Sequence, residues 1–568
     1  MRLYPPRLMT LALAFTLACR PADVAPLDTA AGDTGPGDTE LPSDLLFDPD
    51  HVIEVEIELE VGDWDTIRDQ HRNILDLLTG DCMAGPIESP YSYVQASAML
   101  DGERFEAIGV RKKGLLGSDN PDKPSLKLNM DWAQDGVTYL GHDMLTFNNA
   151  NQDPSYLDQC LGYGLFAAAG LPASRCNFAH ITVNGADLGL YVQVESIRRP
   201  YWEHHLGDDS GNHYEGTLSD FRQGWTDTFD AKDGNSDDRS DLQGVVDALD
   251  APDDQLLVEL GEVLDLDAFY SYWAMEVLTG HWDGYASATN NFHVYDDPSS
   301  GKFLFVPWGI DALFDYQQPF GPSVPESVVA RSAVPRRLYE HQDGRAAYHA
   351  RLLELMDTVW DAQAIDAEID RMVALVTPYL QADEVGAFED GVAVIRAYVP
   401  EREARIRSEL SAGAPDWDEP LRGESCLVDV GGMKGTFETS WGSLTDDSLQ
   451  GGGDLTLEWY GENIPLGQTI SLVGEEQGQA VLAVLGVLAP TSYVYPYFLI
   501  PMSDLEPGVA LAVDWNQVRA YAIYVEGNNA SVLGYIGDGT LSFDEIGTAV
   551  GDPVSGSFDV RIFGGAAE

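Results

Sequence analysis

One stretch, residues 280–315 (GHWDGYASATNNFHVYDDPSSGKFLFVPWGIDALFD), restricts the fold and the chemistry of this chain more than any other. It follows an amphipathic helix predicted over residues 267–278 and opens with a polar loop that carries Asp283, Asn290 and Asn291. A β-hairpin comes next, because two runs rich in aromatic and β-branched residues flank a turn with the sequence DDPSSG. We therefore expect helix, loop and hairpin in that order.

The polar residues of this stretch have an order that phosphoryl transfer can use. Asp283 precedes two amide side chains by seven and eight residues, and a second carboxylate, Asp311, follows the hairpin. In such a site one carboxylate orients the attacking hydroxyl, while the amide and the second carboxylate hold a divalent metal against the phosphates. The alternative is that Asp283 and Asn290 only cap turns, as Asp and Asn do in many loops.

Length and charge limit the architecture and the partners of the chain. At 568 residues it exceeds one ordinary core, so we expect two or more domains. It carries 94 acidic residues against 32 basic ones, a net charge of −62. Such a surface repels phosphate backbones and tolerates a saline medium, so nucleic acid is not expected as a partner.

The N-terminal sequence predicts export. Residues 1–19 contain a short basic start and the apolar run LMTLALAFTLA, which is too short to span a bilayer. The run leads into Cys19 and resembles a bacterial lipoprotein signal; ordinary secretion and an uncleaved signal are the alternatives. Residues 20–49 are rich in Asp, Pro, Gly and Thr and predict a flexible acidic linker. We expect a lipoprotein anchored through lipidated Cys19, periplasmic or at the cell surface.

The remaining cysteines predict disulfides rather than a metal site. An even number outside the cytoplasm permits two disulfides in three connectivities, and none of the spacings suits zinc. We favour the pair Cys160–Cys176, because a helix predicted over residues 153–170 packs on the strand that follows it. The four cysteines are Cys82, Cys160, Cys176 and Cys426.

Basic residues gather in the first part of the folded region, residues 50–423. Arg111 lies in the strand segment IGVRKKG, and Lys123 and Lys127 are spaced to share one face of a strand. Cations on the inner face of a sheet need an anion, either a buried Glu or a nucleotide phosphate. Glu195 ends the strand LYVQVE and is a candidate partner for Lys123 or Lys127; an exposed Glu at a strand end is the alternative.

Other patterns complete the predicted framework. Asn184-Gly185 predicts a type I′ turn between two strands, and residues 63–78 are predicted as one helix. Pro400 should break or kink the last long helix. Further helices are predicted over residues 242–249, 253–264, 336–360, 364–376 and 392–410.

The composition changes near residue 420. Residues 424–568 are rich in Gly and in short strand candidates such as LTLEWYG, TISLVG and AYAIYVEG. This spacing predicts an all-β, sandwich-like domain after an α+β domain. Its basic residues are Lys434, Arg519 and Arg561, and no catalytic constellation is evident, so binding, adhesion or shielding are the expected roles.

Three segments taken together resemble the spore coat protein H (CotH) kinase family of atypical, secreted protein kinases. They are IGVRKKG…KPSLKLNM, NQDPSYLDQCLGYGLFAAAGLPASRCNFAHITVNGADLGLYVQVESI and WDGYASATNNFHVYDDPSSGKFLFVPWGID. The resemblance extends over roughly residues 52–410. It implies a divergent protein-kinase-like domain that binds ATP with Mg²⁺ or Mn²⁺ and phosphorylates exported proteins.

The resemblance also implies roles for single residues. Asp283 is similar to the catalytic-loop Asp, and Asp311 to the second metal ligand. Asn291, or alternatively Asn290, is similar to the metal-binding amide. The positions similar to those that bind phosphate, or that support this binding through an ion pair, are Lys123, Lys127 and Glu195.

Three departures from the family pattern bear on activity. Lys113-Gly114 stands where the family usually has Arg-Gly. Glu215 follows a Tyr where the family often has Lys, which predicts weaker contact with ATP. The family's WDxD becomes WGID, with Gly309 in place of the first carboxylate and Asp311 retained.

These patterns support three hypotheses about function. The first is an exported protein kinase that transfers the γ-phosphoryl group of ATP to Ser or Thr of surface or coat proteins. The second is a catalytically degenerate surface lipoprotein with a structural or adhesive role, favoured by Glu215, Gly309 and the β-rich C-terminal region. The third is a glycan hydrolase that uses Asp283 and Asp311 as an acid–base pair.

Overall fold

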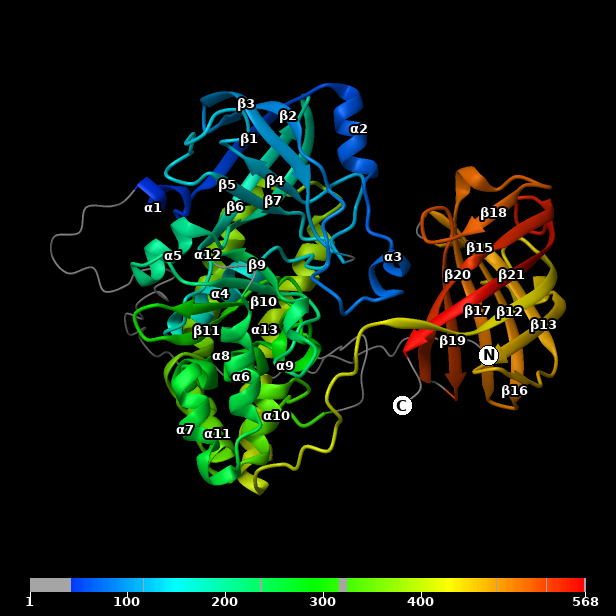
Figure 1. Ribbon diagram of the computed structural model, residues 1–568. Coiled ribbons are helices and arrows are strands. Elements are labelled where there is room, and N and C mark those ends of the chain that lie inside the picture. The colour runs from blue at the N-terminus through cyan, green and yellow to red at the C-terminus, as the bar shows by residue number, and fades with distance from the viewer. Residues whose placement is uncertain are drawn as a thin grey trace, which may run out of the picture.

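The computed structural model has three parts: a barrel, a mainly helical region with a small sheet, and a large C-terminal sheet (Figure 1). The predicted signal peptide and most of the predicted linker lie outside the described residues. No helix among the described residues is long and apolar enough to cross a membrane. The structure describes residues 42–115, 117–234, 238–315, 324–476, 478–527 and 529–565.

The first part is a closed seven-stranded barrel with the order β1-β2-β3-β4-β5-β7-β6. Parallel pairing of β1 with β6 closes it, and the alternation of β1 turns its apolar residues inward. The predicted turn is confirmed, since Asn184 and Gly185 both have positive φ between β6 and β7. The strands are β1 (Val52–Glu58), β2 (Val94–Leu100), β3 (Glu103–Lys112), β4 (Leu126–Asn129), β5 (Met144–Asn148), β6 (Cys176–Val183) and β7 (Ala186–Glu195).

The helical region surrounds helix α8 (Leu266–Thr279), which is buried over most of its length. A four-stranded sheet of order β11-β10-β8-β9 packs beside it, and aromatic rings of β10, β11 and α8 form the shared core. The predicted hairpin is present as β10 (Phe292–Asp297) and β11 (Lys302–Pro307). The partner strands are β8 (His213–Gly216) and β9 (Asp230–Asp233).

Two predicted helices differ in the structure. Residues 63–78 form two short helices, α2 (Val61–Asp69) and α3 (Ile74–Leu78). Helix α13 (Val385–Ala412) runs through Pro400 as one element, so the predicted break does not occur. Tyr398 and Arg402 on either side of that proline donate hydrogen bonds to carbonyl oxygens at the end of α8, and this packing holds the helix.

The remaining predicted helices are present. Residues 42–46 are also helical and Leu46 is buried in the barrel core, so the prediction of a flexible linker is wrong for the end of residues 20–49. The last turn of α8 ends at Gly280 with positive φ, as expected for a helix C-terminus. The helices are α1 (Pro42–Leu46), α4 (Asp158–Ala168), α5 (Arg199–Leu206), α6 (Ser240–Leu249), α7 (Asp253–Val263), α9 (Tyr285–Ala288), α10 (Ala333–Glu340), α11 (Gln342–Thr358) and α12 (Ala362–Val376).

The C-terminal part is all-β, but it is one continuous ten-stranded sheet rather than two separate sheets. Its long, bulged strands curve around a single apolar core, and bridges from Trp441 to Val473 and from Gly451 to Ser471 join distant strands. The strands are β12 (Leu427–Ser440), β13 (Gly452–Trp459), β14 (Glu462–Ile464), β15 (Thr469–Glu476), β16 (Gln479–Ala489), β17 (Ser492–Pro501), β18 (Ala510–Val513), β19 (Arg519–Glu526), β20 (Asn529–Ile546) and β21 (Pro553–Gly565).

Both expected disulfides form. Cys160 of α4 bonds to Cys176 of β6, which confirms the favoured pairing. Cys82 bonds to Cys426 across 344 residues of sequence and joins the segment after α3 to the start of the C-terminal sheet. Figure 1 shows the chain between α13 and β12 as an extended yellow segment that connects the helical region to this sheet.

Candidate functional site

A cavity of about 1200 Å³ lies where the barrel, the helical region and the C-terminal sheet meet. Among the described residues, nine Lys and Arg line this cleft against seven Asp and Glu. The whole chain has 32 basic and 94 acidic residues, so the cleft reverses the charge balance of the molecule. Its volume exceeds the roughly 300–1,000 Å³ of ordinary ligand pockets. We therefore expect an anionic ligand with room for a second molecule.

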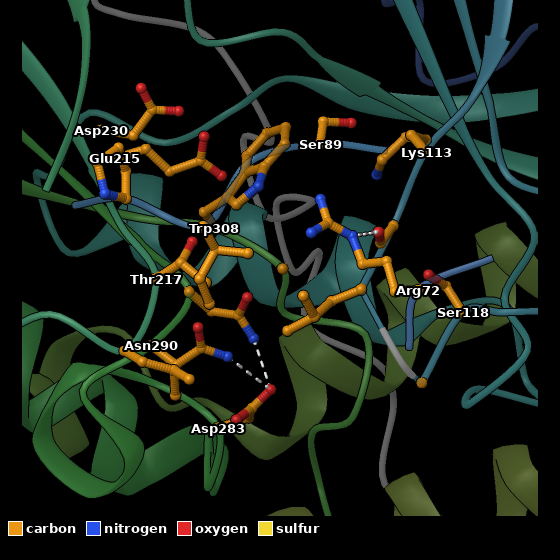
Figure 2. Close-up of a pocket in the computed structure, with 18 of the residues that line it drawn as sticks. Arg72, Ser89, Lys113, Ser118, Glu215, Thr217, Asp230, Asp283, Asn290 and Trp308 are labelled. Carbon is orange, nitrogen blue, oxygen red and sulfur yellow. Dashed lines mark hydrogen bonds between the residues drawn. The ribbon is translucent and has the colours of Figure 1, made fainter. Parts of the chain in front are cut away.

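Asp283 and the two amides predicted from the sequence lie together in this cleft. Asn291 Nδ2 donates to Asp283 Oδ2 at 2.8 Å, and Asn290 Nδ2 donates to the same oxygen at 3.2 Å. Figure 2 shows Asp283 and Asn290 on one side of the cavity, with Lys113 and Arg72 across from them. Asn291 has a positive φ, a conformation that Asn tolerates better than most residues and that clusters at functional sites.

A buried glutamate of α8 holds the loop that carries Asp283. Glu276 Oε1 accepts the backbone N–H of Tyr285 at 2.7 Å, and Oε2 accepts that of Ala286 at 2.9 Å. These bonds satisfy the first turn of α9 and fix the loop against α8. Burial raises the pKa of Glu276 to about 7 despite those bonds. The sequence gives no sign of a role for Glu276, because it lies in an apolar helix with no motif around it.

Helix α4 holds the segment that carries Asp311. Asp158 Oδ2 of α4 accepts the backbone N–H of Leu313 at 2.9 Å. A Cβ atom on Gly162 would lie 2.5 Å from Leu313 Cδ1, so a glycine is needed for this close approach. Asp311 thus lines the cleft beside Asp283, although 28 positions separate them in the sequence.

The two carboxylates have raised pKa values for related reasons. Burial raises the pKa of Asp283 to about 6, and repulsion from Asp311 adds to the effect, while Asn290 and Arg422 oppose it. Burial likewise raises the pKa of Asp311, and attraction to Lys113 opposes that rise. Partly buried carboxylates with raised pKa values in a cleft are a feature of functional sites.

The side chains present suit a hard divalent cation. Asn290 Oδ1 is buried and has no hydrogen-bond partner among the described residues. An amide oxygen left in this state is costly, and a cation such as Mg²⁺ binds oxygen ligands of this kind. Asp311 would add a carboxylate. Among the described residues no three His, Cys, Asp or Glu side chains cluster as a metal site.

The predicted phosphate-binding residues divide into two groups. Arg111 and Lys127 line the cleft, and burial together with repulsion from Arg111 lowers the pKa of Lys127 to about 7. Lys123 lies outside it, with its ammonium 2.7 Å from Tyr156 Oη and 3.4 Å from Glu384. β4 begins at Leu126, after Lys123, so the alternation that placed both lysines on one face does not extend that far.

The predicted ion pair of Glu195 with Lys123 or Lys127 is wrong. Glu195 is completely buried and binds Arg175 at 2.6 Å and His205 at 3.1 Å. Burial opposes its ionisation, but the bonds from His205 and Arg175 outweigh it and hold its pKa well below the usual range. Arg175 precedes β6, and sequence spacing gave no indication that it would reach β7.

Lys113 is the barrel lysine that faces Asp311. Its ammonium donates to Asn148 Oδ1 and lies 5.7 Å from the centroid of the Trp308 ring. Burial lowers the pKa of Lys113 to about 8, and attraction to Asp311 limits the shift. In the sequence, Lys113 stands out only because Lys113-Gly114 replaces the Arg-Gly of the family, so its position in the cleft was not predicted.

Arg72 also reaches the cleft, from the break between α2 and α3. It is held by hydrogen bonds from Nε to the Gly114 carbonyl at 3.0 Å and from Nη1 to the Glu88 carbonyl at 2.9 Å. These two bonds fix the guanidinium while the residue lines the cavity (Figure 2). The prediction of a continuous helix over residues 63–78 had hidden this contribution.

Glu215 and Gly309, the other two departures from the family pattern, both lie in the cleft. Glu215 forms a 2.6 Å ion pair with Lys232 of β9, so a lysine of the neighbouring strand neutralises it. Burial opposes ionisation of Glu215, but attraction to Lys232 lowers its pKa to about 2. Gly309 has a φ of +55°, and a Cβ there would lie 2.5 Å from Asn291 Oδ1. A side chain at Gly309 would therefore disturb the amide that holds Asp283.

Known proteins share the part of the chain that builds most of this cleft. The sequence profile of a family described as CotH kinase protein matches residues 110–405. Inner spore coat protein H of Bacillus subtilis is 21% identical over 296 residues, which cover 48% of this chain and 80% of that protein.

Two fungal proteins match shorter regions. Invasin CotH2 of Rhizopus delemar is 22% identical over 209 residues, or 33% of this chain and 35% of the invasin. Spore coat protein homolog 1 of the same organism is 22% identical over 221 residues, or 36% of this chain and 35% of its own length. The chain thus covers about a third of each fungal relative. Because the family profile spans more than half of its residues, the chain belongs to the CotH kinase family.

Proposed function

We propose that this protein is an exported phosphotransferase that moves the γ-phosphoryl group of ATP to Ser or Thr of surface or coat proteins. The observation that carries the proposal is Asp283, held by two amides and facing Asp311, in a cleft enriched in cations. Family membership agrees with it. In this proposal residues 50–423 adopt a divergent protein-kinase-like fold.

The residues divide the chemistry among themselves. Asp283 orients the acceptor hydroxyl and takes its proton while the hydroxyl oxygen bonds to the γ-phosphorus. The bond from that phosphorus to the bridging oxygen breaks, and ADP leaves. Lys113, Lys127 and Arg111 of the barrel offset the phosphate charge. Asp311 with Asn290 or Asn291 would hold Mg²⁺ or Mn²⁺, which neutralises phosphate charge when bound.

Export is part of the same proposal. The described chain contains two disulfides, one between distant segments and one between neighbouring elements, and disulfides persist mainly outside the cytoplasm. Relatives named for spore coats and as an invasin agree with a place at a cell or spore surface. Attachment through lipidated Cys19 remains a prediction from the sequence.

The proposal is tested by calorimetric titration of the full chain with ATP in the presence and absence of Mn²⁺. We expect binding that requires the metal and that Asp311→Asn abolishes. Asp454→Asn on exposed strand β13 serves as the matched control and should bind normally. Metal-independent binding, or equal binding by both variants, would contradict the assignment of Asp311.

A surface scaffold without catalysis is the second candidate. Glu215 in the cleft and Gly309 in place of a carboxylate favour it, as does the invasin among the relatives. A folded protein that binds no ATP with any divalent metal, and transfers no phosphate to any protein, would support this scaffold and overturn the phosphotransferase.

A further inference from the structure

The segment between α13 and β12, residues 413–426, is attached to the helical region; we call it the strap. Trp417 of the strap is only 8% exposed and joins the main apolar core. The guanidinium of Arg336 donates to the carbonyl oxygens of Trp417 and Glu419. The strap therefore has a defined register on the helical region instead of acting as a loose linker.

This register places Arg422 in the cleft. Its backbone N–H donates to the Arg331 carbonyl at 2.7 Å, and both arginine side chains line the cavity. Asp283 is the acidic group whose attraction acts most on Arg422, but the two do not come within ion-pair distance. Arg331 Nε is buried without a hydrogen-bond partner among the described residues. These guanidinium groups retain capacity to bind an anion.

The C-terminal sheet is held as a third wall of the cleft. It covers the side opposite the helical region and contributes side chains to the cavity from β19, β20 and the loop before β19. Its links to the segment between α2 and β4 include the Cys82–Cys426 disulfide, the 2.7 Å hydrogen bond from Asn73 Nδ2 to the Asp514 carbonyl and the 3.1 Å ion pair of Arg519 with Asp119.

Aromatic rings form the face of this wall. Trp515 lies 5.1 Å from Tyr521 and 5.4 Å from Tyr535, measured between ring centroids. Tyr521 of β19 pairs directly with Tyr535 of β20 and, on its other side, with Tyr497 of β17. The three tyrosines are partly exposed and share the outer face of the sheet, so an aromatic row leads from that face into the cleft.

We propose that the C-terminal sheet and the strap form the acceptor side of the cleft, where Arg422 and Arg331 bind carboxylates of an acidic protein segment. A Ser or Thr of that segment reaches Asp283, and its flanking chain lies along the tyrosine row. This inference rests on the proposed phosphotransferase function and adds the class of acceptor. Lys113 faces Asp311, whereas Arg422 faces Asp283, so donor and acceptor have separate cations.

The acidic surface of the chain does not prevent such a partner from binding. Repulsion between exposed charges more than about 8 Å apart is largely screened at physiological salt. Bidentate bonds between a partly buried guanidinium and a carboxylate persist at short range. The matched family profile ends at residue 405, before the strap, so the acceptor wall belongs to the part of this chain outside that match.

The experiment compares two synthetic Ser/Thr peptides that differ only in their flanking residues, Glu in one and Gln in the other. Transfer from ATP with Mn²⁺ is measured with the full chain, Arg422→Ala, Arg422→Lys and the control Arg561→Ala. Arg561 lies in β21 of the C-terminal sheet, outside the cleft, and forms an ion pair with Asp429. Calorimetry gives the ATP affinity of each protein, and thermal unfolding gives its stability.

We expect the unsubstituted protein to prefer the Glu peptide by at least tenfold in kcat/KM. Arg422→Ala should lose that preference through a higher KM while its ATP affinity changes less than threefold, and Arg422→Lys should keep part of the preference. Arg561→Ala should match the unsubstituted protein. A preference for the Gln peptide, or a loss of ATP affinity in Arg422→Ala as large as the loss of acceptor affinity, would overturn the inference while leaving the phosphotransferase intact. Absence of ATP binding by the unsubstituted protein would overturn both.

Discussion

Two charged clusters in this protein, a buried one around Glu195 and a partly buried one around Asp283, differ in how completely their charges are paired. Glu195 receives bonds from Arg175 and His205, and its pKa lies well below the usual range. Among the described residues, Asp283 receives hydrogen bonds only from the neutral amides of Asn290 and Asn291, and burial raises its pKa to about 6. The first cluster joins β7 of the barrel to its surroundings, whereas the second lines a cleft.

The difference shows how one residue type serves stability in one place and chemistry in another. A buried carboxylate with a matched guanidinium is satisfied and resists change, and removing one partner is strongly destabilising. A buried carboxylate held by amides beside a second carboxylate has unfavourable charge that a cation and an acceptor hydroxyl could relieve. The unfavourable charge at Asp283 is therefore the arrangement expected of a functional residue, and not of one that stabilises the fold.

The largest effect is expected for Asp283→Asn. Removing the proton acceptor should lower the rate of phosphate transfer by about 10²- to 10⁴-fold. Because the variant also removes a buried charge that faces Asp311, the Tm should stay equal or rise. Initial rates and thermal unfolding at pH 7 measure both. Full activity of the variant would show that Asp283 only caps a turn.

Glu195→Ala should reduce stability and leave ATP binding by the folded protein unchanged, the opposite of the result expected for Asp283→Asn. It leaves Arg175 buried without its main partner and should lower the free energy of unfolding by about 3–5 kcal/mol. Urea unfolding measures the loss, and the fraction that remains folded should bind ATP normally. Glu54→Ala, which removes an exposed partner of His180, is the control and should change stability by less than about 1 kcal/mol. Equal losses in the two variants would remove the distinction between the clusters.

Lys113 and Lys123 are expected to differ in how much they contribute to ATP binding. Lys113→Met should weaken ATP binding about 10- to 100-fold, the loss expected for a hydrogen bond to a charged group. Lys123→Met should leave ATP affinity unchanged, because its ammonium binds Tyr156 and Glu384 outside the cleft. Calorimetric titration of both proteins measures the difference. A loss in Lys123→Met alone would return the phosphate site to the position first predicted.

The smallest effect is the pH dependence. Burial raises the pKa of Asp283, so the carboxylate loses its charge as pH falls through about 6, and kcat/KM should drop about tenfold per unit below that value. Burial lowers the pKa of Lys113, so its charge is lost as pH rises through about 8, and ATP affinity should fall there. Lys113→Met should remove the part of the alkaline limb near pH 8, whereas the loss of charge on Lys127 near pH 7 and the acidic limb should remain. A flat profile between pH 5 and 9 would exclude both assignments.

Several parts of the fold and the site could be predicted from local pattern. Asp283, Asn290 and Asn291 lie in a loop between a recognisable helix and a recognisable hairpin, and Asp311 follows directly after that hairpin. The Cys160–Cys176 disulfide joins neighbouring elements and could be predicted for the same reason. The lysines were less accessible, because the choice between Lys113 and Lys123 depends on where β4 begins.

The sequence by itself determined those features that depend on residues close together in the chain. They are the α+β and all-β regions, the hairpin, the polar loop and the order of its carboxylates and amides. Local propensity and hydrophobic periodicity act over such distances. The tertiary structure alone decided which charges influence one another: Arg175 pairs with Glu195, Lys232 pairs with Glu215, and Arg422 attracts Asp283 across the cleft without an ion pair. Those interactions join segments up to 139 positions apart, and their energies depend on burial and distance, which no local pattern contains.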